Sequence, residues 1–451
     1  MTWSPDSWHG LPIEQQPAYR SSEAVGRALA EVKRLPPLVH PGEVDALRNN
    51  LAEVALGRRF LLQGGDCAER FRDCTMSTIE AKLKILLQMS LVLTWGARIP
   101  VVKVARLAGQ YAKPRSRPTE ILDGVEVASY RGDHVNDMPA ELREPDPDRL
   151  VRAYFHSAAT LNYVRALLDG GFADLHEADA WDLGFVRNTS RRTEYETLVE
   201  RILDAMSFLR TTGAGTDPAL RTVQLYSSHE GLLLPYEEAQ TERFDDGWYN
   251  VGAHFLWIGD RTRQLDGAHV EYFRGLRNPI GVKCGPSMDP DELVELLDKL
   301  DPERIPGRIT LITRYGADRI ADLLPAHIRA VQKAGRVPVW SCDPMHGNTR
   351  STGNGFKTRE FASIRKELGL AFRLHRDHGS VLGGVHFELT GDDVTECMGG
   401  PQELGEQDLP RSYETFCDPR LNYAQSLEMA FLMAQTLHRR RADAPELSPL
   451  G

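Results

Sequence analysis

The chain has 451 residues, of which 41% are hydrophobic and 26% are charged, a composition typical of globular proteins. Its formal net charge of −10 argues against nucleic acid as the main partner, because a phosphate backbone requires a basic face. No run of about 18 apolar residues predicts a membrane span, and no signal peptide is recognisable at the N-terminus. Six cysteines without a Cys-x-x-Cys pair are typical of a reduced, cytoplasmic protein.

Residues 1–57 are punctuated by proline and contain two helical patterns, at Ser22–Val32 and Gly42–Leu56. We interpret this segment as an N-terminal extension that packs on the rest of the chain or on a second subunit. From Arg59 onwards, apolar runs alternate with helical patterns, as in a parallel sheet with crossover helices. Residues 58–451 are therefore predicted to form the catalytic unit.

Eight apolar runs are predicted to be buried strands, and helical patterns follow most of them. The predicted strands are Phe60–Gly64, Val101–Arg106, Val223–Ser227, Phe255–Gly259, Ile280–Lys283, Ile309–Arg314, Val337–Cys342 and Gly384–Leu389. The predicted helices are Thr78–Trp95, Thr262–Leu276, Pro290–Leu300, Asp318–Ala334, Thr358–His375 and Asn422–Arg441. Eight such units predict an α/β fold, a (β/α)₈ TIM barrel, and a doubly wound open sheet is the alternative.

A long connection, residues 107–222, separates the second predicted strand from the third. Two groups of its apolar residues recur at helical spacing, namely Leu150, Tyr154, Leu161, Val164 and Leu168, and Leu198, Ile202, Met206 and Leu209. They predict an inserted helical pair within about residues 140–220. Such a pair either pads the barrel wall or provides a regulatory or oligomeric surface.

Charged and polar residues lie at or just after the ends of the predicted strands, where parallel barrels keep their catalytic groups. The strand Val337–Cys342, for example, is followed at once by Asp343 and His346 on a tight turn. The other apolar runs end in Cys67, Arg106, Glu230, Arg261, Lys283, Arg314 and Glu388. This pattern predicts one site to which many strands contribute.

Four of these polar positions are potential metal donors, namely Cys67, His346, Glu388 and Asp418. Singly, each has a structural explanation, such as a cysteine in the core or an aspartate that caps a turn. Together they offer sulfur, nitrogen and oxygen, a set that suits Mn²⁺, Fe²⁺, Co²⁺ or Zn²⁺. Mg²⁺ and Ca²⁺ prefer ligands that are all oxygen.

Cations also gather at the predicted strand ends of this acidic chain. They are Arg106, Lys113, Arg115, Arg261, Arg263, Lys283 and Arg314. Guanidinium groups match phosphate and carboxylate oxygens, so an anionic ligand is predicted. The alternative is pairing within the protein, with Asp66, Asp133, Glu230 or Asp260 as partners. A metal beside a cationic pocket would polarise a carbonyl group while the cations hold phosphorylated substrates.

Seven motifs together resemble class II (plant-type) 3-deoxy-D-arabino-heptulosonate 7-phosphate (DAHP) synthases, over about Glu14 to Leu437. The motifs are Gln63–Glu69, Lys103–Ser116, Tyr130–Asp133, Arg261–Gln264 with Asp266–His269, Cys342–Thr349, Val394–Cys397 and Cys417–Asn422. The resemblance implies a (β/α)₈ barrel that condenses phosphoenolpyruvate with erythrose 4-phosphate and water, releasing phosphate. This transferase reaction is the first step of the shikimate route to chorismate and the aromatic amino acids.

The resemblance also implies roles for individual residues. It implies divalent metal ligands at Cys67, His346, Glu388 and Asp418, with Mn²⁺ expected first and Co²⁺, Fe²⁺ or Zn²⁺ as alternatives. It implies phosphoenolpyruvate contacts at Arg106, Arg261, Lys283 and Arg314, and an erythrose 4-phosphate side at Arg115 and Ser116. Lys113 would lie between the substrates and give a proton to the new alkoxide, so Lys113, Cys67 and His346 are the expected catalytic residues.

Asp260 departs from the family pattern, in which glutamate precedes Arg261-Thr-Arg263. We group Asp260 with the substrate-binding residues, and its shorter side chain is expected to need a water to reach the same partner. Cys417 adjoins Asp418, so we expect it near Cys67, where the two form a disulfide in metal-free protein.

Two other functions remain open at this point. An amino-DAHP synthase, or a pathway-dedicated DAHP synthase of antibiotic or phenazine biosynthesis, would use the same scaffold. A non-catalytic phosphometabolite sensor would keep the pocket, although retention of all four metal donors argues against it. A homo-oligomer, a chorismate mutase partner and feedback by aromatic amino acids are expected partners and properties, and the sequence names no effector.

Overall fold

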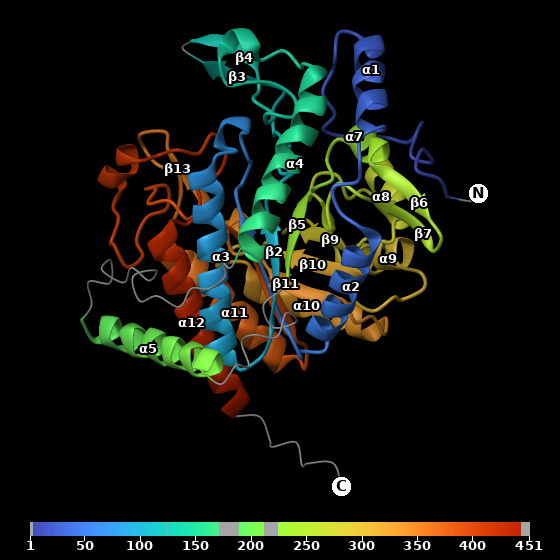
Figure 1. Cartoon of the computed structure of the whole chain (residues 1–451). Coiled ribbons are helices and arrows are strands. Elements are labelled where there is room, and N and C mark those ends of the chain that lie inside the picture. Colours follow the sequence, from blue (N-terminus) through green and yellow to red (C-terminus); the bar gives the residue numbers. More distant parts are fainter. Residues whose placement is uncertain (1–2, 123, 171–188, 212–223, 443–451) are drawn as a thin grey trace.

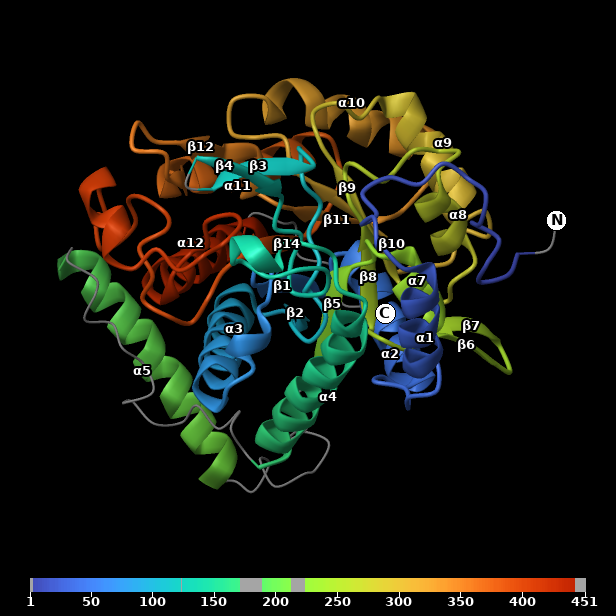
Figure 2. The ribbon, with the colours of Figure 1, turned by 90° about the horizontal axis from the view of Figure 1, so that it is seen from above.

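A computed structural model describes residues 3–122, 124–170, 189–211 and 224–442, and its centre is a closed barrel of eight parallel strands (Figures 1 and 2). The barrel strands are β1 (Phe60–Gly65), β2 (Val101–Arg106), β5 (Leu225–Glu230), β8 (Phe255–Ile258), β9 (Ile280–Cys284), β10 (Ile309–Thr313), β11 (Val339–Cys342) and β14 (Leu382–Glu388). Each pairs in parallel with its neighbours, and β14 pairs with β1 to close the ring. The TIM-barrel prediction is confirmed, and the open sheet is wrong.

Helices surround the barrel, as the view in Figure 2 shows. They are α3 (Met76–Ala97), α7 (Leu234–Ala239), α8 (Ala268–Arg274), α9 (Pro290–Leu300), α10 (Ile320–Lys333), α11 (Phe361–Asp377) and α12 (Tyr423–Ala442). Four short 3-10 helices are described, namely η1 (Phe71–Asp73), η2 (Ala140–Leu142), η5 (His346–Asn348) and η6 (Glu406–Arg411). Three hairpins lie outside the barrel sheet, namely β3–β4 (Thr119–Leu122, Val125–Ala128), β6–β7 (Thr241–Phe244, Gly247–Asn250) and β12–β13 (Thr349–Ser351, Lys357–Arg359).

The inside of the barrel changes from apolar to polar along the strands. Near the strand starts, Leu61, Phe255 and Val339 form one buried cluster, which side chains of helix α2 (Pro41–Ala55) join. Further along β1, Gln63 donates to Ser228 Oγ of β5 at 3.1 Å. Helix α2 therefore covers the apolar end of the barrel, which leaves the polar end for ligands. The division of the chain at residue 57 stays a prediction.

Several predicted elements begin later than the sequence pattern suggested. Val337 is 65% exposed and precedes β11, because Pro338 has no N–H for the strand ladder. The helix predicted from Thr262 begins at Ala268, since Thr262 closes a turn onto Gly259 O. The helix predicted from Thr358 begins at Phe361, because Thr358 pairs within the β12–β13 hairpin.

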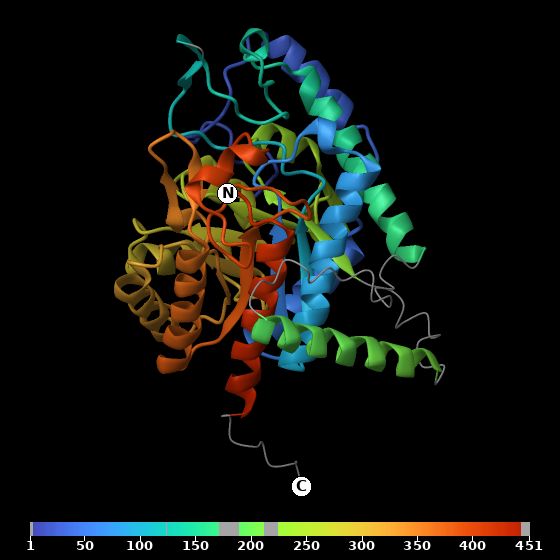
Figure 3. The ribbon, with the colours of Figure 1, turned by 90° about the vertical axis from the view of Figure 1, so that its left-hand side faces the viewer.

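The predicted insertion contains two long helices, α4 (Asp148–Asp169) and α5 (Thr189–Thr211), and both contact α3. Helix α4 packs mainly on α1 (Ser22–Val32), whereas α5 lies across α3 and α12 (Figure 3). The rings of Tyr195 and Phe431 stack between α5 and α12 at a centroid distance of 4.0 Å. Residues 171–188 and 212–223, which include part of this insertion and Val223, lie outside the described residues.

Within the described part of the chain, no helix combines the length and the apolar character that crossing a bilayer requires.

The packing of α3 against α12 generates a stability prediction. A Cβ at Gly96 of α3 would lie 2.4 Å from Ala434 Cβ of α12, whereas a Cβ at Gly369 of α11 would meet nothing within 4 Å. Gly96→Ala should lower the free energy of unfolding by about 1–3 kcal/mol through overpacking. Gly369→Ala, the matched control, should raise it by about 0.5–1 kcal/mol. Urea unfolding of both variants checks this, and equal effects would contradict it.

Candidate active site

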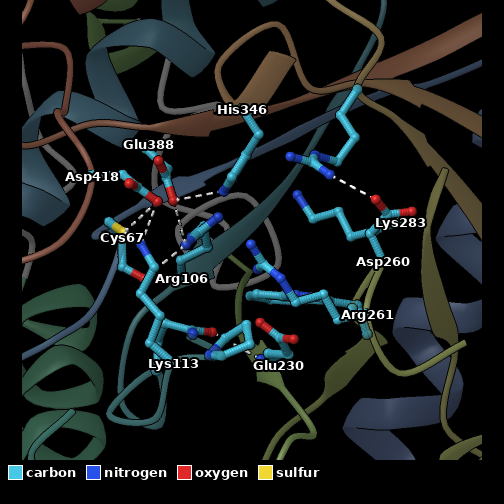
Figure 4. Close-up of a pocket in the computed structure, with 15 residues that line it drawn as sticks. Cys67, Arg106, Lys113, Glu230, Asp260, Arg261, Lys283, His346, Glu388 and Asp418 are labelled. Atoms are coloured by element: carbon cyan, nitrogen blue, oxygen red, sulfur yellow. Dashed lines mark hydrogen bonds and ion pairs between the residues drawn. The ribbon is translucent and has the colours of Figure 1, made fainter. Parts of the chain in front are cut away.

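A pocket lies at the C-terminal ends of the barrel strands and is open to solvent. Ten side chains predicted from the sequence line the pocket, namely Cys67, Arg106, Lys113, Asp260, Arg261, Lys283, Arg314, His346, Glu388 and Asp418. In Figure 4 the sulfur and two carboxylates lie at one side, Lys283 and Arg261 lie at the other, and Arg106 lies between them.

Cys67, Glu388 and Asp418 form a compact group of potential metal donors. One donor atom from each lies within 4.8 Å of the other two, although the residues come from the turn after β1, from β14 and from the segment before α12. His346 of η5 adjoins the group, with Nε2 3.1 Å from Glu388 Oε1. Burial opposes ionisation of Glu388, but His346 and Arg359 outweigh it and hold the pKa of Glu388 well below its usual range.

Asp343 fixes the orientation of His346. Its Oδ2 lies 2.7 Å from His346 Nδ1 and also accepts from Lys283 Nζ at 2.5 Å. Because Nδ1 faces this carboxylate, Nε2 is the ring nitrogen that faces Glu388. Burial lowers the pKa of Lys283 to about 8, with Asp343 opposing the shift. The strand-end aspartate therefore links an anion-binding lysine to a potential metal ligand.

Lys113 reaches the donor group from the loop after β2. Its ammonium contacts Cys67 Sγ and donates to Asp418 Oδ2 at 2.5 Å. Burial lowers the pKa of Lys113, but Asp418 and Cys67 outweigh this and raise it well above its usual value. Burial, and the hydrogen bond with Cys417, raise the pKa of the Cys67 thiol. The structure thus places Cys417 beside Cys67, as expected, with both thiols free.

The loop that carries Lys113 is held by Glu69, whose carboxylate accepts three consecutive backbone N–H groups. The donors are Ala108 at 3.0 Å, Gly109 at 2.9 Å and Gln110 at 2.9 Å. Gln110 in turn accepts from the backbone N–H of Glu230 through Oε1 at 2.8 Å. This arrangement fixes the loop after β2 against the end of β5.

Arg106 is the central cation of the pocket and is 3% exposed. It donates to Cys67 O at 3.0 Å and to Glu388 Oε1 at 3.2 Å, and its guanidinium lies 5.2 Å from the Trp257 ring centroid. Burial, with nearby cations, holds the pKa of His386 well below its usual range. The neutral ring therefore accepts from Arg106 through Nε2 at 2.6 Å.

Asp260 holds the cations on the opposite side of the pocket. It accepts from Arg314 Nη1 at 2.8 Å, from Arg263 Nε at 3.1 Å and from Gly285 N at 3.1 Å. These direct contacts mean that the expected bridging water is not needed for Asp260 to reach either guanidinium. Arg263, however, is directed at Asp260 and at Glu292, which lies 2.7 Å from its Nη1, so its cation is neutralised within the protein.

The two residues assigned to the erythrose 4-phosphate side do not belong to the pocket lining. Ser116 touches the lining through Oγ, which accepts from Arg261 Nη2 at 2.8 Å. Arg115 forms an ion pair with Glu120 of β3 at 2.6 Å. Their roles stay predictions.

Several residues that the sequence analysis did not assign to the site also contribute. Trp257, Gln110 and Gly259 line the pocket. Lys357 lies 3.1 Å from Asp418, and Arg359 lies 2.8 Å from Glu388. Lys357 and Arg359 belong to β13, a strand of three residues, which is too short for an alternating pattern to be recognised in the sequence. The sequence analysis instead predicted that a helix begins at Thr358. Only the two basic residues on either side of Thr358 could have suggested a role in the site.

The fold and the pocket define a class of protein before any comparison is made. A closed (β/α)₈ barrel carries, at its polar end, a sulfur–carboxylate donor group beside Arg106, Lys283, Arg261 and Arg314. Donor groups of mixed type suit a transition metal, and converging guanidinium groups suit phosphate or carboxylate. The class is that of TIM-barrel enzymes that act on anionic substrates.

Comparison with known proteins gives the family. The profile of the class-II DAHP synthetase family matches residues 3–434. A phospho-2-dehydro-3-deoxyheptonate aldolase of Neurospora crassa is 52% identical over 459 aligned residues, which cover 98% of this chain and 95% of that protein. A protein of the same name from Streptomyces coelicolor is 51% identical over 436 residues, covering 95% and 96%. The chain belongs to the class-II DAHP synthetase family.

Family membership confirms the resemblance found in the sequence. The activity is that of a DAHP synthase, a transferase of the shikimate route and aromatic biosynthesis. It implies phosphoenolpyruvate and erythrose 4-phosphate as substrates. The family is generally metal-dependent, and Cys67, Glu388 and Asp418 offer a metal site in this chain.

A buried carboxylate behind the pocket generates a prediction about pH. Glu367 Oε1 accepts from Tyr315 N at 3.0 Å and Gly316 N at 2.8 Å, and its Oε2 accepts from Asn348 Nδ2 at 2.6 Å. Burial outweighs these bonds and raises the pKa of Glu367 from 4.5 to about 7. Between these values the folded state binds more protons than the unfolded state, so the stability contribution of Glu367 falls as pH rises.

Glu367→Gln should remove this contribution. The difference in unfolding free energy, wild type minus variant, should fall by on the order of 3 kcal/mol from pH 4.5 to pH 7.5. Urea unfolding at four pH values measures it. Identical pH dependence in the two proteins would show that Glu367 does not titrate in this range.

Proposed function

We propose that Cys67, His346, Glu388 and Asp418 hold one divalent transition metal, with Mn²⁺ expected first and Co²⁺, Fe²⁺ or Zn²⁺ as alternatives. The observation that supports this most is the approach of three donor atoms, from distant parts of the chain, to within 4.8 Å of one another. His346 Nε2 lies 3.1 Å from Glu388 Oε1. When bound, the metal supplies Lewis-acid activation of the aldehyde carbonyl of erythrose 4-phosphate.

We infer that Arg106, Arg261, Lys283 and Arg314 bind phosphoenolpyruvate. All four line the pocket, and Lys283 and Arg106 lie 5.9 and 5.2 Å from the centroid of the Trp257 ring, which supports their placement on one wall. Planar guanidinium groups match the phosphate and carboxylate of this substrate. Asp260 and Asp343 stand behind Arg314 and Lys283 and orient them.

Lys113 is the group that we propose to protonate the new alkoxide. It lies beside the donor group and begins the loop Lys113–Ser116, where Arg115 and Ser116 are proposed to hold the phosphate of erythrose 4-phosphate. Because the pKa of Lys113 is raised, its side chain carries a proton at neutral pH. Its ammonium contacts Cys67 and Asp418, so a nascent alkoxide beside the donor group would lie within its reach.

Further properties remain proposals. We keep the division into an N-terminal extension (1–57) and a catalytic barrel (58–451) with an insertion at about 140–220. We propose a homo-oligomer, a chorismate mutase as an additional partner, and a cytoplasmic location. The location is supported by the six cysteines, all of which are free.

The direct test is phosphate release from phosphoenolpyruvate and erythrose 4-phosphate by the full-length protein. Activity should disappear with a chelator and return with Mn²⁺ or Co²⁺. Cys67→Ser should lose most of the metal-stimulated rate because a thiolate ligand is missing. Full metal-stimulated turnover in that variant would exclude Cys67. A parallel assay with the imino analogue of erythrose 4-phosphate distinguishes an amino-DAHP synthase.

Arg314→Gln tests the anion-binding wall. Loss of one charged hydrogen bond to phosphate costs roughly 1.5–3 kcal/mol, so the KM for phosphoenolpyruvate should rise about ten- to a hundredfold. The KM for erythrose 4-phosphate should change much less. Arg319→Gln, an exposed arginine at the start of α10, is the matched control and should leave both values unchanged. An unchanged KM for phosphoenolpyruvate in Arg314→Gln would remove Arg314 from the binding site.

A further inference from the structure

Arg359 of β13 is completely buried directly behind the donor group. Its Nη1 lies 2.8 Å from Glu388 Oε2 and donates to Pro419 O, and its Nε donates to Thr349 Oγ1 at 2.9 Å. Glu388 is one proposed metal ligand, and Pro419 directly follows another, Asp418. Thr349 ends η5, the turn that begins with His346. One guanidinium thus contacts the segments that carry three of the four proposed ligands.

The ion pair with Arg359 means that the two carboxylate oxygens of Glu388 face different partners. Oε1 lies 3.1 Å from His346 Nε2 and 3.2 Å from Arg106 Nη2, whereas Oε2 faces Arg359. Oε2 is shielded from solvent and has no hydrogen-bond partner among the described residues apart from this ion pair. Without Arg359 a buried carboxylate oxygen would be unpaired, and the carboxylate would lose the contact that fixes its rotation.

We propose that Arg359 is a positioning residue of the metal site, which fixes Glu388 and aligns the segments of Asp418 and His346 with it. The inference rests on the proposed metal site and adds a residue that does not itself ligate the metal. Groups that orient metal ligands typically affect metal affinity by 10–100-fold.

The geometry requires the guanidinium fork and not only a positive charge. Arg359 uses Nε and Nη1 in different directions, toward Thr349 Oγ1 and toward Glu388 with Pro419. A lysine ammonium keeps the charge but is a single point and lacks the planar fork. Arg359→Lys therefore separates positioning from charge neutralisation.

The experiment measures metal affinity independently of turnover. Metal-free wild type and Arg359→Lys are titrated with Co²⁺, and the thiolate-to-cobalt absorption that Cys67 provides is recorded. The dissociation constant should rise 10–100-fold in Arg359→Lys. The Mn²⁺ concentration for half-maximal phosphate release should rise similarly, while the rate at saturating Mn²⁺ changes less. Affinity within twofold of the wild type would overturn the proposal.

Arg336→Lys is the matched control. Arg336 is also a buried arginine that contacts a carbonyl, Asp301 O, and a carboxylate, Asp298, but it precedes β11 at the opposite end of the barrel. Its replacement should leave Co²⁺ affinity unchanged. Equal loss of affinity in both variants would show that general destabilisation is the cause and would overturn the proposal.

Thr349→Val keeps the inference testable if Arg359→Lys does not fold. It removes the oxygen that accepts from Arg359 Nε and also makes a longer bond of 3.5 Å to Met345 O, in a side chain of similar shape. Co²⁺ affinity should fall by about three- to tenfold, and an unchanged affinity would overturn the proposal. The proposed site itself is tested separately, because a wild-type absorption band that persists in Cys67→Ser would refute Cys67 ligation whatever Arg359 does.

Discussion

The site depends on the register in which β1 lies between β14 and β2. Gly65 is paired with Glu388 on one side and with Arg106 on the other. A Cβ at Gly65, whose φ is 144°, would lie 2.5 Å from Arg106 O, so this close approach requires glycine. Cys67 follows two residues later. Barrel closure therefore brings a thiol, a carboxylate and a guanidinium together, although the carboxylate of Glu388 is 282 residues away from Arg106 in the chain.

Charges gathered at one buried end of a barrel destabilise the fold unless each has a partner. Here the partners form a second network beneath the ligands. Arg420 donates to Asp66 Oδ1 at 2.7 Å and to Glu396 Oε1 at 2.7 Å, while Lys82 contacts Asp66 from α3. Because Asp66 precedes Cys67 and Arg420 follows Asp418 by two positions, this network fastens the two donor segments to each other.

The sequence predicted the barrel because buried parallel strands are apolar runs, and their ends are chemically conspicuous. Strand β2 (Val101–Arg106) is an example, because its mainly apolar residues are followed by Arg106, the central cation of the pocket. The starts of strands were predicted less well. Val337 was assigned to a strand because it is apolar, but the sequence does not show whether an apolar residue before a proline is hydrogen-bonded in the sheet. Asp418 lies on an irregular segment before the last helix, and its residue type made it a candidate donor, because no local spacing relates it to the other three.

The contacts between side chains could not be predicted in the same way. Nothing local in the sequence couples Lys113 to Asp418, or Arg359 to Glu388, because both pairs exist only once the barrel has closed and the β12–β13 hairpin has folded over it. From the sequence, each cation could either bind an anionic substrate or pair with an acidic residue of the protein. The structure shows that Arg263 pairs internally, and that Arg314 pairs with Asp260 while still lining the pocket.

Asp260 shows how a short side chain can reach its partners. The motif resemblance led us to expect glutamate here, and Asp260 reaches Arg314 and Arg263 directly. Gly285 makes this reach possible, because its N–H donates to Asp260 Oδ1 and a Cβ there would lie 2.3 Å from Oδ2. A close glycine backbone thus supplies an extra donor and leaves space for the carboxylate. Arg314 of the anion-binding wall thus contacts the carboxylate of Asp260, and Glu388 of the donor group contacts the guanidinium of Arg359, so in both places a charge that faces the pocket is paired with an opposite charge behind it.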